Sequence, residues 1–228
     1  MNQLIQTSSE EAVDIIQPLL KENRNILITG LPGTGKTFLA NRLLELNPRI
    51  RSMAYTKMAA SLLKKGKTFH SRYNLSVKSL KRESKQFSNK QTVMYDEIST
   101  LSIDLFEKLY KLNGPKTNYI LMGDSYQLPP VEGYPFFDFL YNEKLYNPLD
   151  LVNIELTKIY RQKDDIYYQG ILQEIRENGI ILTNRVEKFI KERTNIQIPE
   201  HVINDCVYIA PLNKDVNKHN SQFSKYTP

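Results

Sequence analysis

The 228-residue chain is poor in cysteine: Cys206 is the only one, so no disulfide can form within the chain. It has no apolar run approaching the roughly 20 residues that cross a bilayer. The first residues, Met1–Leu4, show neither the basic start nor the long apolar stretch of a secretory signal. Internal repeats and low-complexity tracts are also missing. We therefore expect an intracellular protein, of the cytoplasm or nucleus, with no membrane partner.

Acidic residues are outnumbered by basic ones, which gives a formal charge of +6 and a pI of about 9.2. Hydrophobic residues make up 40% of the chain and charged residues 25%, as is ordinary for a globular protein. The basic balance favours a polyanionic partner. Richness in Asn, Lys, Ile and Tyr is typical of an AT-rich genome, such as that of a phage or a large virus.

Apolar stretches with strand and helix patterns alternate along the chain, which predicts an α/β fold. A capping box, Ser8 with Glu11, starts the first helix, which Pro18 should kink or shorten. The expected strands cover 26–29, 53–55, 92–95, 119–122 and 206–210, with a further strand starting at Leu151, and the expected helices cover 36–46, 58–65, 104–112 and 166–176. The aromatic stretch after Pro130 is expected to be loop-like.

The first chemical motif is GLPGTGKT, at Gly30–Thr37, which matches the phosphate-binding loop pattern in full. It follows an apolar strand and precedes a helix, so its backbone N–H groups and the helix N-terminus can cradle phosphates. Lys36 should reach the β- and γ-phosphates of a nucleotide, and Thr37 should bind Mg²⁺. The residues expected to bind nucleotide are Gly30, Leu31, Pro32, Gly33, Thr34, Gly35, Lys36, Thr37 and Phe38.

A pair of acids, Asp96 and Glu97, ends a later apolar strand. Ligands of open α/β sheets collect at the carboxyl ends of the strands, so Asp96 should face the Mg²⁺ held at the loop. Glu97 should orient and deprotonate the attacking water. An Asp-Glu pair outside this context would indicate only a solvated turn.

Four further motifs follow in order. They are YTKMAA at 55–60, GKTFHS at 66–71, GDSYQLPPV at 123–131 and LTKIYRQ at 156–162. Together with the phosphate loop and the acids, they resemble superfamily 1 helicases of the 5′-to-3′ branch, which includes RecD-like and Dda-like enzymes. The resemblance covers residues 8–162. It implies a RecA-like P-loop NTPase with a parallel sheet flanked by helices, a small basic insert and an incomplete second RecA-like domain.

The resemblance also implies roles for particular residues. Gln127 would sense the γ-phosphate, and Arg161 would reach across from the second domain to stabilise the transferring phosphoryl group. As alternatives, Gln127 is a turn residue and Arg161 is a surface arginine. Catalysis would thus depend on Lys36, Glu97, Gln127 and Arg161.

The nucleic-acid track would be contacted through its backbone, without sequence readout. The residues implied are Thr56, Lys57, Thr68, His70 and Arg72. The segment 71–90 is strongly basic with interleaved aromatic residues, which suits single-strand binding, and its alternative is a solvated basic loop.

The sequence departs from the family in two places. Ser9 stands where the family usually has a glutamine that reads adenine, so other nucleoside triphosphates are candidate substrates beside ATP. The family's last two motifs are missing after residue 220, as expected for a piece of a longer protein or for a naturally short chain. An isolated first domain should bind nucleotide, hydrolyse it slowly and not translocate.

We expect residues 1–150 to form the ATPase domain, with the basic insert, and residues 151–228 to begin the second domain. The primary hypothesis is an enzyme that hydrolyses MgATP on single-stranded DNA or RNA, with other replication proteins as further partners. The alternative is a nucleotide-gated binding module with little turnover. A P-loop kinase is disfavoured by the GDSYQLPPV motif.

Overall fold

A computed structural model describes residues 4–75, 90–142, 149–178 and 183–193, together with 214, 217 and 218. The chain divides into two compact units, residues 1–169 and residues 170–228, which we describe separately. Within the described residues, no helix is long and apolar enough to cross a membrane.

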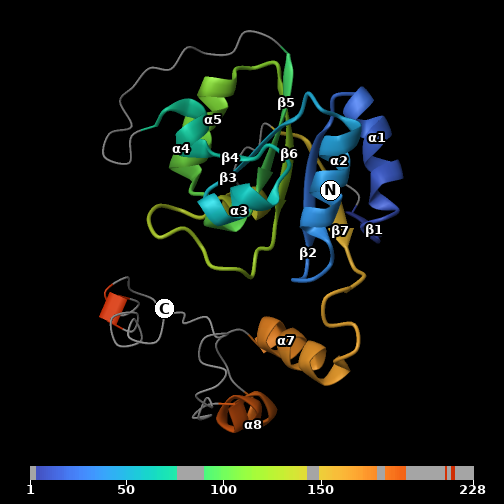
Figure 1. The fold of residues 1–228 in the computed structure, drawn as a ribbon, viewed down its shortest axis with the longest axis vertical. Helices are drawn as coiled ribbons and strands as arrows, with labels where there is room; N and C mark the ends of the chain where they lie inside the picture. Colours follow the sequence, from blue (N-terminus) through green and yellow to red (C-terminus); the bar gives the residue numbers. More distant parts are fainter. Residues whose placement is uncertain are drawn as a thin grey trace, which may run out of the picture. The chain divides into compact units, whose positions relative to one another are not determined.

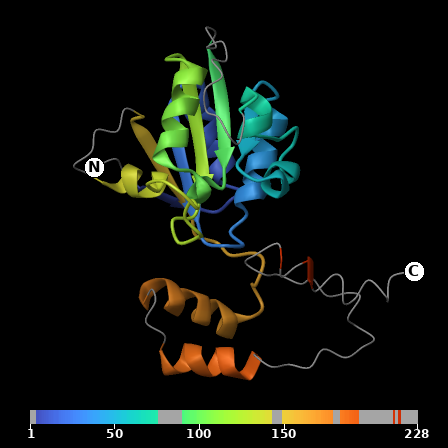
Figure 2. The ribbon, with the colours of Figure 1, turned by 90° about the vertical axis from the view of Figure 1, so that its left-hand side faces the viewer.

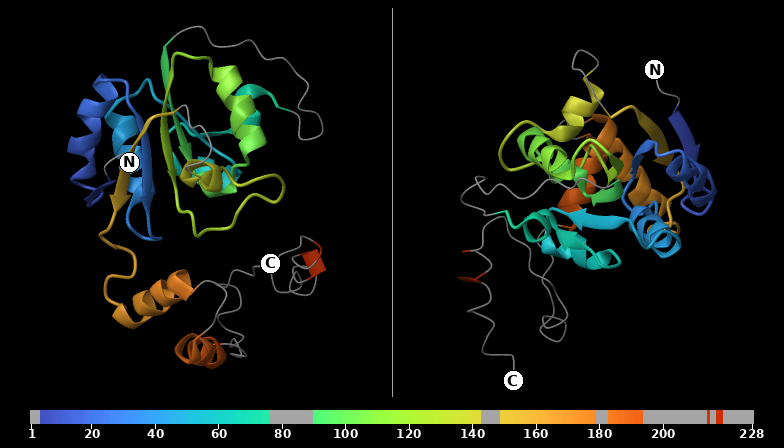
Figure 3. Two further views of the ribbon diagram at one scale, coloured as in Figure 1. Left: turned by 180° about the vertical axis from the view of Figure 1, so that it is seen from behind. Right: turned by 90° about the horizontal axis from the view of Figure 1, so that it is seen from above.

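The first unit is built on one parallel sheet of seven strands in the order β1-β7-β2-β6-β5-β3-β4. The turned views in Figure 2 and Figure 3 show these strands side by side. Since all strands are parallel, their carboxyl ends lie along a single edge. The strands are β1 (Leu4–Thr7), β2 (Asn25–Gly30), β3 (Arg51–Ala54), β4 (Lys67–Thr68), β5 (Gln91–Asp96), β6 (Thr117–Gly123) and β7 (Leu151–Leu156).

Helices cover both faces of the sheet, with α1 and α2 on one side and α4 and α5 on the other (Figure 1). The helices are α1 (Ala12–Lys21), α2 (Lys36–Leu46), α3 (Lys57–Leu62), α4 (Phe69–Tyr73), the 3-10 turn η1 (Ile98–Thr100), α5 (Ile103–Asn113), α6 (Phe136–Tyr141), α7 (Ile166–Asn178) and α8 (Asn184–Arg193).

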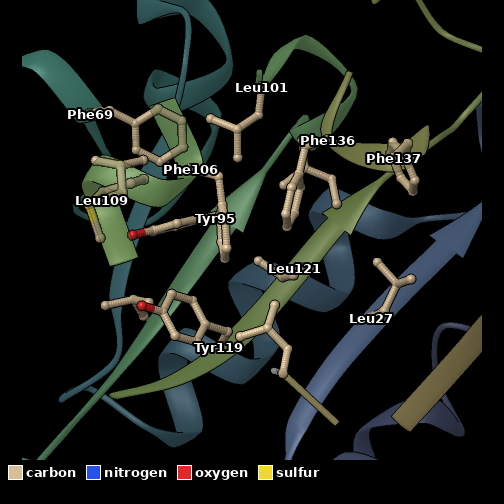
Figure 4. Packing of buried hydrophobic residues seen from close by; sticks show 14 of the residues in the cluster. Leu27, Phe69, Tyr95, Leu101, Phe106, Leu109, Tyr119, Leu121, Phe136 and Phe137 are labelled. Atoms are coloured by element: carbon tan, nitrogen blue, oxygen red, sulfur yellow. The ribbon is translucent and has the colours of Figure 1, made fainter. Parts of the chain in front are cut away.

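The pleat of the strands sorts side chains between two cores. In β2, Ile26 and Ile28 point to the α1 and α2 core, whereas Leu27 joins the opposite core. The opposite core is rich in aromatic rings, such as Phe106 stacked on Phe136 with centroids 4.0 Å apart (Figure 4). These two apolar layers fix the sheet and therefore the edge at which the candidate site lies.

The aromatic core also contains a buried polar network. Asn113, at the end of α5, donates from Nδ2 to the Tyr95 hydroxyl at 2.6 Å and accepts from the Tyr73 hydroxyl at 2.5 Å. Desolvation raises the pKa of the Tyr95 hydroxyl well above its ordinary value, so the ring stays neutral. Paired hydroxyls in an apolar core tie α4 and α5 to β5 in one arrangement.

The expected capping box is present before α1. The Glu11 amide donates to Ser8 Oγ at 3.3 Å, and the Glu11 carboxylate accepts from the Ser8 amide at 3.4 Å. The Ser8 hydroxyl, which donates to the Glu11 carboxylate at 3.0 Å, and then the Ser8 amide lower the pKa of Glu11. Pro18 lies inside α1, which continues to Lys21, so the proline does not end the helix where it occurs.

The structure differs from the expected domain boundary. β7 was expected to open a second domain after residue 150, but it pairs with both β1 and β2 in the first sheet, and the chain divides after Gln169. In the second unit, the part of α7 from Gly170 onward and α8 lie side by side, with an ion pair between Glu174 and Arg185 at 3.4 Å (Figure 2). The expected strand at 206–210 and most of the basic insert, residues 76–89, lie outside the described residues.

Candidate nucleotide-binding and catalytic site

The phosphate loop joins β2 to α2 at the carboxyl edge of the sheet. Gly35 is the N-cap of α2 and has a left-handed backbone with φ 87°. A Cβ atom at Gly35 would lie 2.7 Å from Ser9 Oγ, so both the conformation and the space require glycine. Thr34 braces the loop by donating from Oγ1 to the carbonyl oxygen of Leu31 at 2.8 Å. The loop therefore takes a turn that depends on glycine, and the Ser9 side chain lies directly against it.

Lys36 is the only cation among the loop residues, and it is 9% exposed. Its ammonium group donates to the carbonyl oxygens of Gly30 at 2.7 Å and Leu31 at 3.1 Å. These bonds hold the charge at the mouth of the loop. A phosphate oxygen placed there would compete for the same donors.

The acid pair lies beside this lysine. Asp96 ends β5 and is 4% exposed. Burial and, to a smaller extent, the neighbouring Glu97 carboxylate raise the pKa of Asp96 to about 6, while a hydrogen bond from the Glu97 amide and the charge of Lys36 oppose the rise. Lys36 and Asp96 therefore lie close enough for their charges to interact.

Glu97 has an unusual backbone for a residue with a side chain, with φ 54° and ψ 46°. Left-handed conformations of this kind cost roughly 1–2 kcal/mol and gather at functional sites. The Glu97 amide donates to Asp96 Oδ1 at 3.0 Å, which locks the turn. Glu97 therefore leaves the line of β5 at the same edge as the phosphate loop.

The turn after β6 carries the predicted sensor, Gln127. Asp124 is 1% exposed and organises the turn, because its carboxylate accepts from the Tyr126 amide and its carbonyl oxygen accepts from the Gln127 amide, both at 3.1 Å. β6 pairs with β2 and β5, so this turn begins between the phosphate loop and the acids. Gln127 is half-buried.

The segment after β7 packs on the phosphate loop. The Gly33 carbonyl oxygen accepts from the amides of Tyr160 at 2.8 Å and Arg161 at 3.4 Å. A Cβ atom at Gly33, where φ is 86°, would lie 2.8 Å from the Arg161 Cβ atom and 3.0 Å from Gln162 Oε1. Arg161 therefore adjoins the loop from within the first unit, whereas the resemblance implied a reach from the second domain.

Sequence reasoning gave no role to Tyr160 or Gln162, although both belong to the 156–162 motif. The Tyr160 hydroxyl donates to the Glu10 carboxylate, and the Lys158 ammonium lies 5.0 Å from the centre of the Tyr160 ring. These contacts tie the segment after β7 to the turn before α1. Membership of the 156–162 motif was the sequence feature that could have pointed to Tyr160 and Gln162.

The hydroxyls of Thr56 and Thr68 serve as helix caps. Thr56 Oγ1 accepts from the Ala59 amide at the start of α3, and Thr68 Oγ1 accepts from the Ser71 amide at the start of α4, both at 3.1 Å. Each hydroxyl keeps its own hydrogen as a donor for a phosphate. Ala54 of β3 aligns with Thr68 in β4, so both caps follow strand ends at the carboxyl edge.

Of the other predicted nucleic-acid contacts, His70 and Lys57 lie near Thr56 and Thr68, whereas the charge of Arg72 does not. The His70 ring meets the exposed Tyr55 ring edge-on, with centroids 5.8 Å apart. Lys57 is exposed at the first position of α3. The charge of Arg72 instead acts on Arg51, the first residue of β3, which lies at the opposite edge of the sheet. Sequence reasoning missed Tyr55, which adjoins Thr56 in the motif.

The donors fit magnesium only in combination with a nucleotide. Thr37 lies in the first turn of α2, next in the chain to Lys36, whose charge acts on Asp96. Mg²⁺ prefers oxygen ligands and is commonly bound through one or two protein groups plus phosphate oxygens. In the part of the chain that the structure describes, no three His, Cys, Asp or Glu side chains gather as a metal cage.

The chain is similar to known proteins in sequence and in fold. The AAA_30 family model, described as an AAA domain, matches residues 8–197. Among curated proteins, the human ATP-dependent DNA helicase PIF1 is 31% identical over 191 residues, or 74% of this chain and 29% of the relative. The Bdellovibrio bacteriovorus ATP-dependent DNA helicase Pif1 is 27% identical over 210 residues, or 82% of this chain and 47% of the relative.

Solved structures share the fold. A Bacteroides Pif1 helicase in complex with ADP-AlF3 and single-stranded DNA aligns with a TM-score of 0.70 at 24% identity, covering 96% of this chain and 57% of that one. The Candida albicans Pif1 helicase aligns with a TM-score of 0.67 at 22% identity, covering 95% and 54%. The chain therefore spans about half or less of the relatives it matches.

Proposed function

The chain belongs to the AAA_30 family of AAA domains, and from this premise we propose that it is the ATP-hydrolysing motor domain of a superfamily 1 DNA helicase of the 5′-to-3′ branch. The observation that carries the proposal is the meeting of Lys36, Asp96 and Glu97 at one sheet edge, with the Arg161 segment seated on Gly33. A phosphate loop, a buried acid and an adjacent base are the parts that phosphoryl transfer to water requires.

In this mechanism the loop amides and Lys36 bind the β- and γ-phosphates. Thr37 and Asp96 would hold Mg²⁺, which neutralises charge on the phosphates when bound. Glu97 accepts the proton of the attacking water, for which its turn at the end of β5 places it beside Asp96. Arg161 stabilises negative charge on the transferring group.

Two further assignments complete the proposal. Gln127 would sense the γ-phosphate from the turn after β6 and relay nucleotide state to the DNA track. Thr56, Lys57, Thr68 and His70 would contact the backbone of single-stranded DNA, because they gather at the carboxyl edge on α3 and α4. Ser9 offers one short hydroxyl where an adenine-reading amide would lie, so other nucleoside triphosphates should also be hydrolysed.

The test separates nucleotide binding from turnover. Lys36→Ala should lose both nucleotide binding and hydrolysis. Glu97→Gln should still bind nucleotide but hydrolyse it at least about 100-fold more slowly, as expected for loss of a general base. Glu107→Gln, a matched change of an exposed glutamate on α5, should behave as the unchanged protein.

The measurements are nucleotide affinity by fluorescence titration and phosphate release at saturating MgATP. Normal hydrolysis by Glu97→Gln would remove Glu97 as the base. Tight nucleotide binding without turnover in the unchanged protein would instead favour a nucleotide-gated binding module.

A further inference from the structure

A second basic site lies at the edge of the sheet opposite the phosphate loop. A cavity of about 570 Å³ opens where β3 and β5 begin and where α1 and α2 end. Gln91, which lines the cavity, lies five residues before Asp96 in β5, which is roughly 16 Å at about 3.3 Å per residue. The residues that line it are Gln17, Leu20, Lys21, Asn47, Arg49, Ile50, Arg51, Lys90, Gln91 and Thr92.

All the charged residues that line the cavity are positive. The lining contains four cations, which are Lys21, Arg49, Arg51 and Lys90, and no carboxylate. Among the described residues, no ion pair involves Lys21, Arg49 or Lys90. Like charges gathered without a counter-charge repel each other and create a positive potential that attracts an anion.

Arg51 is held in place within this cluster. Its guanidinium donates to Gln91 Oε1 at 2.6 Å. Partial burial and the nearby charge of Arg72 lower its pKa. Bringing an anion into the cavity would relieve this repulsion, and the hydrogen bond to Gln91 means that little side-chain freedom is lost on binding.

Helix electrostatics account for only part of the cluster. Lys21 lies in the last turn of α1, where a cation complements the helix dipole. The end of α2, however, is satisfied by Asn47, whose amide nitrogens donate to the Leu43 carbonyl oxygen at 2.9 and 3.1 Å. Arg49 and Lys90 therefore have no role as helix caps. Gln17 also lines the cavity, and its buried Nε2 atom has no hydrogen-bond partner among the described residues.

The composition of the lining indicates what the anion is. Single strands are usually held by aromatic side chains that stack on bases, and this lining has none. Cations and neutral amides instead suit phosphate groups contacted without base readout. We propose that this cavity binds the phosphodiester backbone of duplex DNA as a second site, distinct from the single-strand track. The choice of DNA rests on the proposed helicase function.

The test uses the full chain and a blunt, fluorescently labelled 20-base-pair duplex. Lys21→Glu with Arg49→Glu should weaken duplex binding roughly tenfold. The slope of log Kd against the logarithm of the salt concentration should fall by about 2, because two phosphate contacts are lost. The matched control is Lys111→Glu with Lys188→Glu, which reverses an exposed last-turn lysine of α5 and an exposed lysine of α8. The control should bind duplex like the unchanged protein.

ATP hydrolysis with single-stranded oligonucleotide is measured on the same proteins. The proposal predicts that Lys21→Glu with Arg49→Glu leaves this stimulation unchanged. Equal duplex affinity in all three proteins would overturn the second site, as would a parallel loss of single-strand and duplex binding. Absence of stimulation in the unchanged protein would contradict the proposed function and not the duplex site.

Discussion

At the scale of residues, the buried carboxyl of Asp96 lowers the stability of the nucleotide-free protein when it is ionised. Burial raises its pKa to about 6, from an ordinary value of 3.8. A carboxyl with a raised pKa stabilises the fold below its unfolded pKa and loses that stability as the pH rises through the folded pKa. Above pH 6 the ionised Asp96 therefore destabilises the fold until a cation neutralises it.

Asp96→Asn should consequently raise the free energy of unfolding of the nucleotide-free, magnesium-free protein at pH 8 by on the order of 2 kcal/mol. The gain should shrink as the pH falls through 6 and vanish near pH 4. Urea unfolding at pH 8 and pH 5 measures it. The exposed Asp164→Asn serves as the control, and an identical gain from Asp96→Asn at both pH values would contradict the account.

At the scale of elements, the phosphate loop depends on what packs against it. Gly35→Ala would place a methyl group in a left-handed backbone and against Ser9. We expect the free energy of unfolding to fall by about 1–3 kcal/mol and nucleotide affinity to drop. Adding Ser9→Gly should restore the steric part of the loss, leaving the backbone cost. Thermal unfolding and nucleotide titration measure both, and full activity of Gly35→Ala alone would contradict the role of Gly35.

Helices and strands that carry a motif or a clear periodicity of apolar residues could be predicted from the sequence, and short elements could not. The helix expected at 36–46 matches α2, because the loop fixes its start and Pro48 follows its end. β4 has two residues and α4 has five, which is too short for a period to show. α6 falls in a stretch expected to be loop-like, and its buried Phe136 and Phe137 form it by packing on the sheet.

At the scale of the whole molecule, the missed features depend on long-range pairing. β7 was recognisable as a strand, but its place between β1 and β2 is set by partners more than a hundred residues away. The same pairing carries Arg161 to Gly33, a contact that spacing alone does not predict. By contrast, Asp96 could be placed from sequence, because parallel strands end at a common edge.

Whether the chain is a DNA-dependent motor is decided by its rate of ATP hydrolysis with and without single-stranded DNA, measured for the unchanged chain and for Glu97→Gln. We expect the DNA to accelerate hydrolysis by the unchanged chain several-fold and Glu97→Gln to stay slow under both conditions. Hydrolysis that is indifferent to single-stranded DNA, while nucleotide still binds, would contradict the assignment of a DNA-dependent motor.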